Sequence, residues 1–199
     1  MKNKSLQYFL LYKPFNVLCQ FTDSSLTKRT LGEVYPFPKN VYPVGRLDTD
    51  SEGLLILTND KTLNHRLLNP QFAHKRTYWV QVEGIPTIEA LEELEKGVDI
   101  KVNKKMYHTK KAAVKLLQNP PSVPDRNPPI RFRKNQATSW LELTLTEGKN
   151  RQVRRMTAKV GFPTLRLIRA SIEGLTIEGM NVGQALKVSK NTLERKVFG

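Results

Sequence analysis

The sequence predicts an α+β fold built around a largely antiparallel sheet. Apolar residues alternate at period two in the segments 76–84 and 139–148, which is typical of strands. Apolar residues recur at helical spacing in 87–97 and 147–162. The two kinds of segment follow one another without strict alternation, which favours α+β over a doubly wound sheet.

Three strands and one helix are expected in the first third of the chain. The strands cover residues 8–12, 17–21 and 54–57, and the last is a continuous apolar run typical of a strand covered on both faces. Asp60 is expected to cap a short helix that ends at Asn69-Pro70.

The middle of the chain predicts a strand followed by a helix. In the strand 76–84, one face carries Tyr78 and two valines. Thr87 is expected to begin the helix, Ile88, Leu91 and Leu94 to share its buried face, and Gly97 to end it.

Five prolines lie between residues 119 and 136, in front of the strand 139–148. Because both flanks of this segment have strand patterns, we interpret 119–136 as a stiff basic loop rather than a linker. The prediction is therefore one domain over residues 1–199, which is long enough for two halves that share a sheet.

The segment "EGKNRQVRRMTAKVGF" predicts a helix that ends at Gly161. At about 100° per residue, its apolar side chains gather on one face. Arg151 and Arg155 point the opposite way, and Arg154 falls at the border of the two faces. The alternative interpretation is an ordinary solvated basic face.

A net charge of +15 indicates a polyanionic partner, most often nucleic acid. The alternative is a basic protein without such a partner, but the charge is clustered as well as large. The clusters occupy residues 74–80, 101–111, 130–136 and 147–159.

Several classes of protein are disfavoured. Cys19 is the single cysteine and cannot form an internal disulfide, and three scattered histidines make a structural zinc site improbable. A charged residue, Lys13, interrupts the early apolar run, no signal-peptide cleavage site follows, and no apolar stretch could span a membrane. A cytoplasmic location is the default expectation.

Three acids, Asp48, Asp50 and Glu52, precede the apolar run 54–57. They match the first half of a calcium loop, but Asn59 stands where that loop needs a bidentate glutamate, so this interpretation fails. We interpret Asp50 and Glu52 as turn or surface acids. Asp48 begins a rigid strand, where an ionised carboxylate can act on an anomeric carbon as nucleophile or base.

Three segments in order, "GRLDTDSEGLLILTND", "KRTYWVQVEG" and "EGKNRQVRRMTAKVGFPTLRLIR", resemble the motifs of the RsuA/RluB/RluE/RluF branch of pseudouridine synthases. The segments "FTDSSLTKRTL" and "RNPPIRFRKNQATSWLELTLTEGKNRQVRRM" resemble the RluE group, which acts on 23S ribosomal RNA. The resemblance implies the pseudouridine synthase fold, a mainly antiparallel mixed sheet in two halves with helices packed on it and a central catalytic cleft. It also implies isomerisation of a uridine without cofactor or metal.

The resemblance assigns roles to four residues. Asp48 is the catalytic carboxylate, either as nucleophile at C1′ or as the base that removes the 2′ proton. Tyr78 would stack on the extruded uracil, although "YWV" alone would favour a core tyrosine. Arg154 would pair with the aspartate, and Leu165 would line the pocket.

Many members of the branch carry an S4 RNA-binding module, for which the early first strand leaves no room. The catalytic domain is then expected to bind RNA itself, through Arg46, Arg76, Arg131, Arg133, Lys149, Asn150, Arg151, Gln152 and Arg155. The expected partner of this monomer is 23S rRNA, free or in a ribosomal precursor. The alternatives are a sibling synthase acting on 16S rRNA or another uridine, and a non-catalytic rRNA-binding or ribosome-assembly protein.

Overall fold

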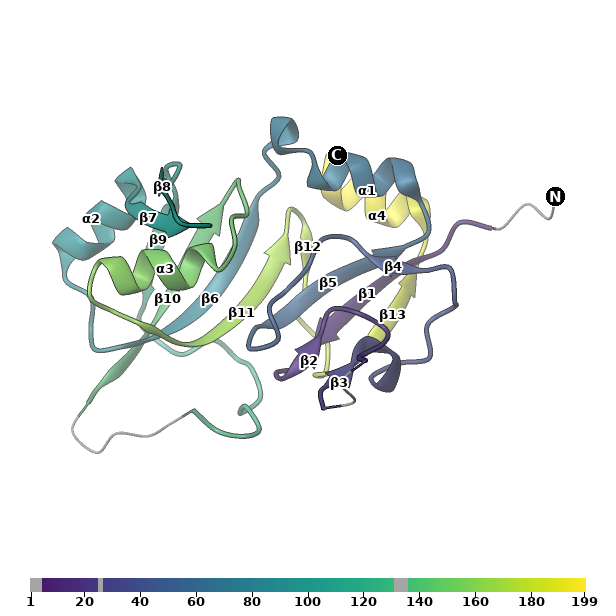
Figure 1. Ribbon diagram of the computed structural model, residues 1–199, viewed down its shortest axis with the longest axis horizontal. Coiled ribbons are helices and arrows are strands. Elements are labelled where there is room, and N and C mark those ends of the chain that lie inside the picture. Colours follow the sequence, from purple (N-terminus) through teal and green to yellow (C-terminus); the bar gives the residue numbers. More distant parts are fainter. Residues whose placement is uncertain (1–4, 25–26, 131–135) are drawn as a thin grey trace. The chain divides into compact units, whose positions relative to one another are not determined.

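The structure, a computed structural model, describes residues 5–24, 27–130 and 136–199. The chain forms two compact units, one of residues 1–73 and 170–199 and the other of residues 74–169 (Figure 1). Strand β11 (Thr164–Ile172) begins in the second unit and ends in the first. Within the described ranges, no helix is both long and apolar enough to cross a membrane.

The described part of the first unit contains mostly strands, with two α-helices. Its elements are β1 (Tyr8–Lys13), β2 (Val17–Leu18), β3 (Arg29–Thr30), the 3₁₀ helix η1 (Leu31–Glu33), β4 (Tyr42–Pro43), β5 (Glu52–Thr58), α1 (Lys61–Leu68), the 3₁₀ helix η2 (Pro70–Phe72), β12 (Leu175–Thr176), β13 (Ala185–Val188) and α4 (Lys190–Phe198).

Strand β1 lies between β5 and β13 and is antiparallel to both. Every residue of β5 is buried, as the continuous apolar run predicts for a strand covered on both faces. Phe9, Leu11, Leu55 and Leu57 from these strands join one hydrophobic cluster. The start of β5 therefore stands on a fixed support.

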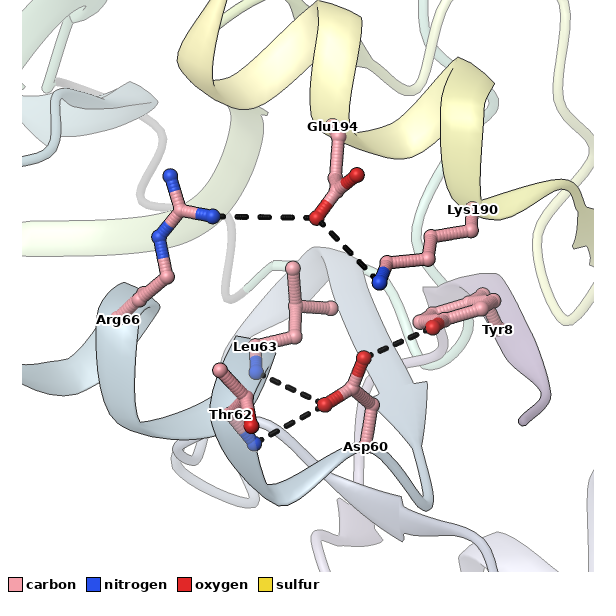
Figure 2. A network of polar contacts seen from close by, with 7 residues as sticks. All are labelled: Tyr8, Asp60, Thr62, Leu63, Arg66, Lys190 and Glu194. Carbon is pink, nitrogen blue, oxygen red and sulfur yellow. Dashed lines mark hydrogen bonds and ion pairs between the residues drawn. The ribbon is translucent and has the colours of Figure 1, made fainter. Parts of the chain in front are cut away.

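Asp60 caps α1 as predicted. Its side chain accepts hydrogen bonds from the N–H groups of Thr62 and Leu63 at 3.0 and 3.1 Å, and from the Tyr8 hydroxyl at 2.8 Å (Figure 2). Burial alone would raise the pKa of Asp60, but these donors together with the charge of Lys190 hold the pKa below its ordinary value. The cap thus joins α1 to β1.

Helices α1 and α4 lie side by side (Figure 1). The Arg66 guanidinium lies 3.7 Å from the centroid of the Phe198 ring. It also lies 3.8 Å from Glu194, which faces Lys190 at 3.9 Å (Figure 2). These contacts tie the end of the chain to the helix that follows β5.

The second unit contains a helix-flanked antiparallel sheet. Its elements are β6 (Arg76–Glu83), α2 (Ile88–Lys96), β7 (Asp99–Val102), β8 (Lys105–His108), β9 (Ala113–Leu117), β10 (Thr138–Leu145) and α3 (Gln152–Lys159).

In the second unit, the strand order is β11, β6, β10, β9, and β10 is antiparallel to both β6 and β9. The described part of the proline-rich loop, residues 119–130, contains no helix or strand, and it leaves from β9 and leads to the neighbouring β10. The buried side chains of Leu141, Leu143 and Leu145 face the core, as their period-two spacing predicts.

Three local predictions need correction. The strand expected over 17–21 covers only Val17–Leu18, because the chain bends so that the Gln20 carbonyl accepts from Leu31 N–H at 2.9 Å. Ile88 is 72% exposed, since it stands six residues before Leu94 and is therefore rotated about 120° away from the buried face, which Ala90 occupies instead. Helix α3 begins only at Gln152, because Arg151 adopts a left-handed conformation with φ 51°.

Candidate functional site

Asp48 lies in a turn immediately before β5 and is half-buried. The Ser51 N–H donates to the Asp48 carbonyl at 3.0 Å, which closes the turn 48–51. Two further bonds hold it: the Asn16 N–H donates to the Thr49 carbonyl at 2.8 Å, and the Leu47 N–H to Cys19 Sγ at 3.2 Å. The backbone that carries Asp48 is thus fixed on both sides.

A buried lysine supports the same turn. Lys13 ends β1, is 0% exposed, and donates from Nζ to the carbonyls of Ser51 at 2.7 Å and Pro14 at 2.9 Å. In the β1–β5 register Lys13 lies opposite Gly53, which has no side chain to compete for the space. Because a buried ammonium group is costly unless its donors are used, this arrangement holds the turn firmly.

The surface interpretation of Glu52 is wrong. Glu52 is only 2% exposed, because it is the first residue of a strand that is covered along its whole length. Asp50 is half-buried in the turn, which agrees with its interpretation as a turn acid. Arg46, two residues before Asp48, is exposed.

The second unit brings Tyr78, Arg154 and Leu165 onto neighbouring elements. Tyr78 is a half-buried residue of β6, opposite Leu143 of β10, and it packs against the hydrophobic core. Arg154 of α3 is half-buried, as its border position predicts, and one guanidinium nitrogen lies 3.4 Å from the Thr164 carbonyl. The half-buried Leu165 follows in β11, the strand beside β6.

The turn 147–151 presents polar and basic side chains at the start of α3. Arg151 is exposed, and Arg155 donates to the Asn150 carbonyl at 3.1 Å and to its Oδ1 at 3.3 Å. Lys149 places its ammonium 4.6 Å from the centroid of the Tyr107 ring. Two segments distant in sequence thus meet at this turn.

Gln152 is buried, and its amide makes hydrogen bonds within the protein. Its Nε2 donates to Glu147 at 2.6 Å, and its Oε1 accepts from the Lys149 N–H at 2.9 Å. The side chain that the sequence suggested for RNA contact therefore shapes the turn that carries Lys149.

The comparisons with known proteins agree with this architecture. The sequence matches the family described as RNA pseudouridylate synthase over residues 7–159. The chain belongs to this family. It is therefore an isomerase that makes pseudouridine in RNA.

Relatives of the synthase extend the match over most of the chain. One from Xanthomonas axonopodis, named ribosomal large subunit pseudouridine synthase E, is 52% identical over 82% of this chain and 84% of its own length. One with the same name from Vibrio vulnificus is 48% identical over 89% of this chain and 73% of its own length. The ribosomal large subunit pseudouridine synthase B of Bacillus subtilis is 35% identical over 94% of this chain and 70% of its own length.

A crystal structure of pseudouridylate synthase shares the fold, with a TM-score of 0.79 and 24% identity, covering 99% of this chain and 76% of the other. The predicted α+β class, with its mainly antiparallel sheet, is thereby confirmed.

Of the remaining predicted RNA contacts, Arg76 is half-buried at the start of β6 and donates to the His74 carbonyl at 3.2 Å. Arg131 and Arg133 lie outside the described residues.

Sequence reasoning missed two residues that build the synthase's local geometry. Lys13 stands next to a proline after an apolar run, and the sequence analysis used it only as the charge that interrupts this run. Glu147 was included in the α3 segment, yet it is 7% exposed and accepts from three donors, which are Tyr107, the Lys110 N–H and Gln152. A charged residue inside an apolar segment was the available signal in the case of Lys13.

The pKa of Tyr107 is raised to about 12, chiefly by its hydrogen bond to Glu147 and then by burial. The phenol therefore remains a donor to Glu147 even in mildly alkaline solution.

Proposed function

We propose that the chain isomerises one uridine of 23S ribosomal RNA to pseudouridine. The observation that carries this proposal is the identity of about 50% to relatives named for the large ribosomal subunit, over more than four fifths of the chain. The net charge of +15 supports a substrate of high negative charge. A bacterial rRNA substrate would place the enzyme in the cytoplasm, and we propose that it acts there as a monomer.

In the proposed reaction, the N1–C1′ bond of the target uridine breaks and a C5–C1′ bond forms. The proton that leaves C5 is balanced by one that N1 gains, so the product is an isomer of the substrate. Since no net oxidation or reduction occurs, we propose that neither a cofactor nor a metal takes part.

Asp48 is proposed to supply the reacting carboxylate, either by attacking C1′ or by removing the 2′ proton. Its support is the fixed turn: hydrogen bonds to Asn16, Ser51 and the buried Lys13 hold the backbone around it. A fixed backbone limits the reorganisation that this side chain needs before it reacts. Arg154 is proposed to keep it ionised by pairing with it.

The target uridine is proposed to flip out of the RNA stack before it reacts, since a stacked base is out of reach. Tyr78 would then stack on the uracil, and Leu165 would line the pocket beside it. Both side chains are half-buried on the neighbouring strands β6 and β11, so each retains surface that a base could contact.

The proposed contacts to the RNA backbone are Arg46, Arg76, Lys149, Asn150, Arg151 and Arg155, with Arg131 and Arg133 from the proline-rich loop. We propose that Gln152 acts indirectly, by orienting the backbone of Lys149. The rRNA would be bound either free or in a ribosomal precursor.

Tritium release from rRNA labelled at uridine C5 tests this proposal, because the C5 proton must leave. We expect release by the wild-type enzyme from 23S rRNA and none above background by Asp48→Asn. Equal release by both proteins would reject the role of Asp48. Release from 16S but not from 23S rRNA would reject the proposed substrate.

A further inference from the structure

The hairpin β7–β8 and the residues after it carry an unusual concentration of positive charge. Residues 101–111 contain five lysines and no acid, and all five are exposed: Lys101, Lys104, Lys105, Lys110 and Lys111. The one acid of β7, Asp99, is bonded to His108 at 2.9 Å. Because like charges so close together repel one another, this surface is suited to an anionic partner.

The tip of the hairpin holds one lysine in a costly conformation. Asn103 and Lys104 both have positive φ, 49° and 66°, as a two-residue turn of type I′ requires. Glycine is usual at the second position, and another residue there costs about 1 kcal/mol. The tip thus keeps a lysine where glycine would be more stable.

A buried carboxylate joins this hairpin to the turn 147–151. Glu147 accepts from the Tyr107 hydroxyl in β8, from the Lys110 N–H at 2.9 Å, and from Gln152 Nε2 at 2.6 Å. The Lys149 ammonium adds a contact to the Tyr107 ring. The hairpin and the turn that carries Lys149 are therefore held against each other within the second unit.

We propose that the lysines of the β7–β8 hairpin bind phosphates of the substrate RNA. The inference deepens the proposed function, since it adds a second contact region to the same substrate. Lysine side chains act on phosphates as point charges, so the region should add affinity with little dependence on sequence. Glu147 sets the position of this region relative to Lys149 and Arg151.

The first test uses the double variant Lys104→Gln/Lys105→Gln and a long 23S rRNA fragment. Filter binding over a series of salt concentrations should show a Kd about tenfold higher near 0.1 M salt and a salt slope smaller by about 1.5, as expected for two lost phosphate contacts.

The matched control is Lys61→Gln/Lys187→Gln, which removes the same charge from two exposed lysines of the first unit. We expect it to leave both Kd and salt slope near the wild-type values. Equal effects of the two double variants would overturn the proposal, because RNA binding would then depend on the net charge of the protein and not on the hairpin lysines. Since binding is measured apart from turnover, absence of tritium release by the wild type would reject the proposed function alone.

A second test concerns the Glu147 connection. Tyr107→Phe removes one hydroxyl and no charge. It should loosen the hairpin and raise the Kd for the long RNA about threefold, which corresponds to the net contribution of one hydrogen bond. In the background of Lys104→Gln/Lys105→Gln, Tyr107→Phe should have a much smaller effect. Additive effects in this double-mutant cycle would contradict the idea that the hairpin and the turn bind RNA together.

Discussion

Two aspartates flank strand β5, and the structure holds them in different ways. Asp60, after the strand, is 7% exposed, and its carboxylate accepts from Tyr8, Thr62 and Leu63. Asp48, before the strand, is half-buried in a turn whose backbone is bound by Lys13, Asn16 and Ser51.

The Asp60 carboxylate itself stabilises the fold through its hydrogen bonds. At Asp48 the hydrogen bonds fix the backbone, and the backbone positions the carboxylate. Removing the Asp60 side chain removes the bonds that join α1 to β1. Removing the Asp48 side chain leaves the backbone bonds of its turn in place. We therefore expect Asp60 variants to lose stability and Asp48 variants to lose activity.

The largest effect on stability is expected at the lysine that supports the Asp48 turn. Lys13→Met leaves the Ser51 carbonyl without its charged donor, so the free energy of unfolding should fall by about 3 kcal/mol. The turnover number should fall about 100-fold, since a displacement of about 1 Å is enough for that. Urea unfolding and tritium release measure the two effects.

The control for this variant is Lys187→Met, an exposed lysine of β13 in the same unit. It should change neither quantity. A Lys13→Met protein with wild-type stability and turnover would show that the turn does not depend on the buried ammonium.

The next effect concerns the helix cap. Asp60→Ala should lower the free energy of unfolding by about 2 kcal/mol, because two helix N–H groups lose their acceptor. Turnover at saturating RNA should stay at the wild-type value in conditions where the protein is folded. A large loss of turnover without a loss of stability would contradict the assignment of Asp60 to stability and Asp48 to activity.

A smaller effect is expected at Tyr8. Tyr8→Phe removes one hydrogen bond to Asp60 and keeps the ring, so the free energy of unfolding should fall by about 1 kcal/mol. Tyr35→Phe, in the aromatic cluster with Phe9 and Phe37, is the control and should be nearly neutral. Equal losses in the two variants would mean that the hydroxyl of Tyr8 contributes nothing specific.

The smallest effect is a dependence on pH. The pKa of Asp60 is lower in the folded protein than its ordinary value, so its charge stabilises the fold above the unfolded pKa of about 3.9. That stabilisation is lost as the pH falls through the folded pKa. The gap in unfolding free energy between wild type and Asp60→Asn should be constant near neutral pH and shrink in acid. A gap that widens in acid would contradict this sign.

The contrast also shows which features a sequence can predict. The Asp60 cap was predictable because a cap depends on residues within one turn of helix. Its bond to Tyr8 was not, since the two residues are 52 positions apart and meet only through the register of β1 and β5. The burial of Lys13 depends on the same register, which places it opposite Gly53.

The strands β7 and β8 were missed for a related reason. They are only four residues each, so the alternation of Ile100 and Val102 in β7 is too short to predict a strand as the longer patterns of β6 and β10 do. The pairing of Glu147 with Tyr107 likewise joins residues 40 positions apart. Motif resemblance suggested the reactive residues, whereas the side chains that hold them depend on contacts distant in sequence.

The most direct test of the account is a map of pseudouridines in rRNA from cells that lack the chromosomal gene and carry one plasmid copy. One pseudouridine of 23S rRNA should disappear in the deletion strain. It should return with the wild-type protein and with Asp60→Asn, and remain absent with Asp48→Asn at equal protein level. Restoration of that site by Asp48→Asn would contradict the central claim that this carboxylate performs the reaction.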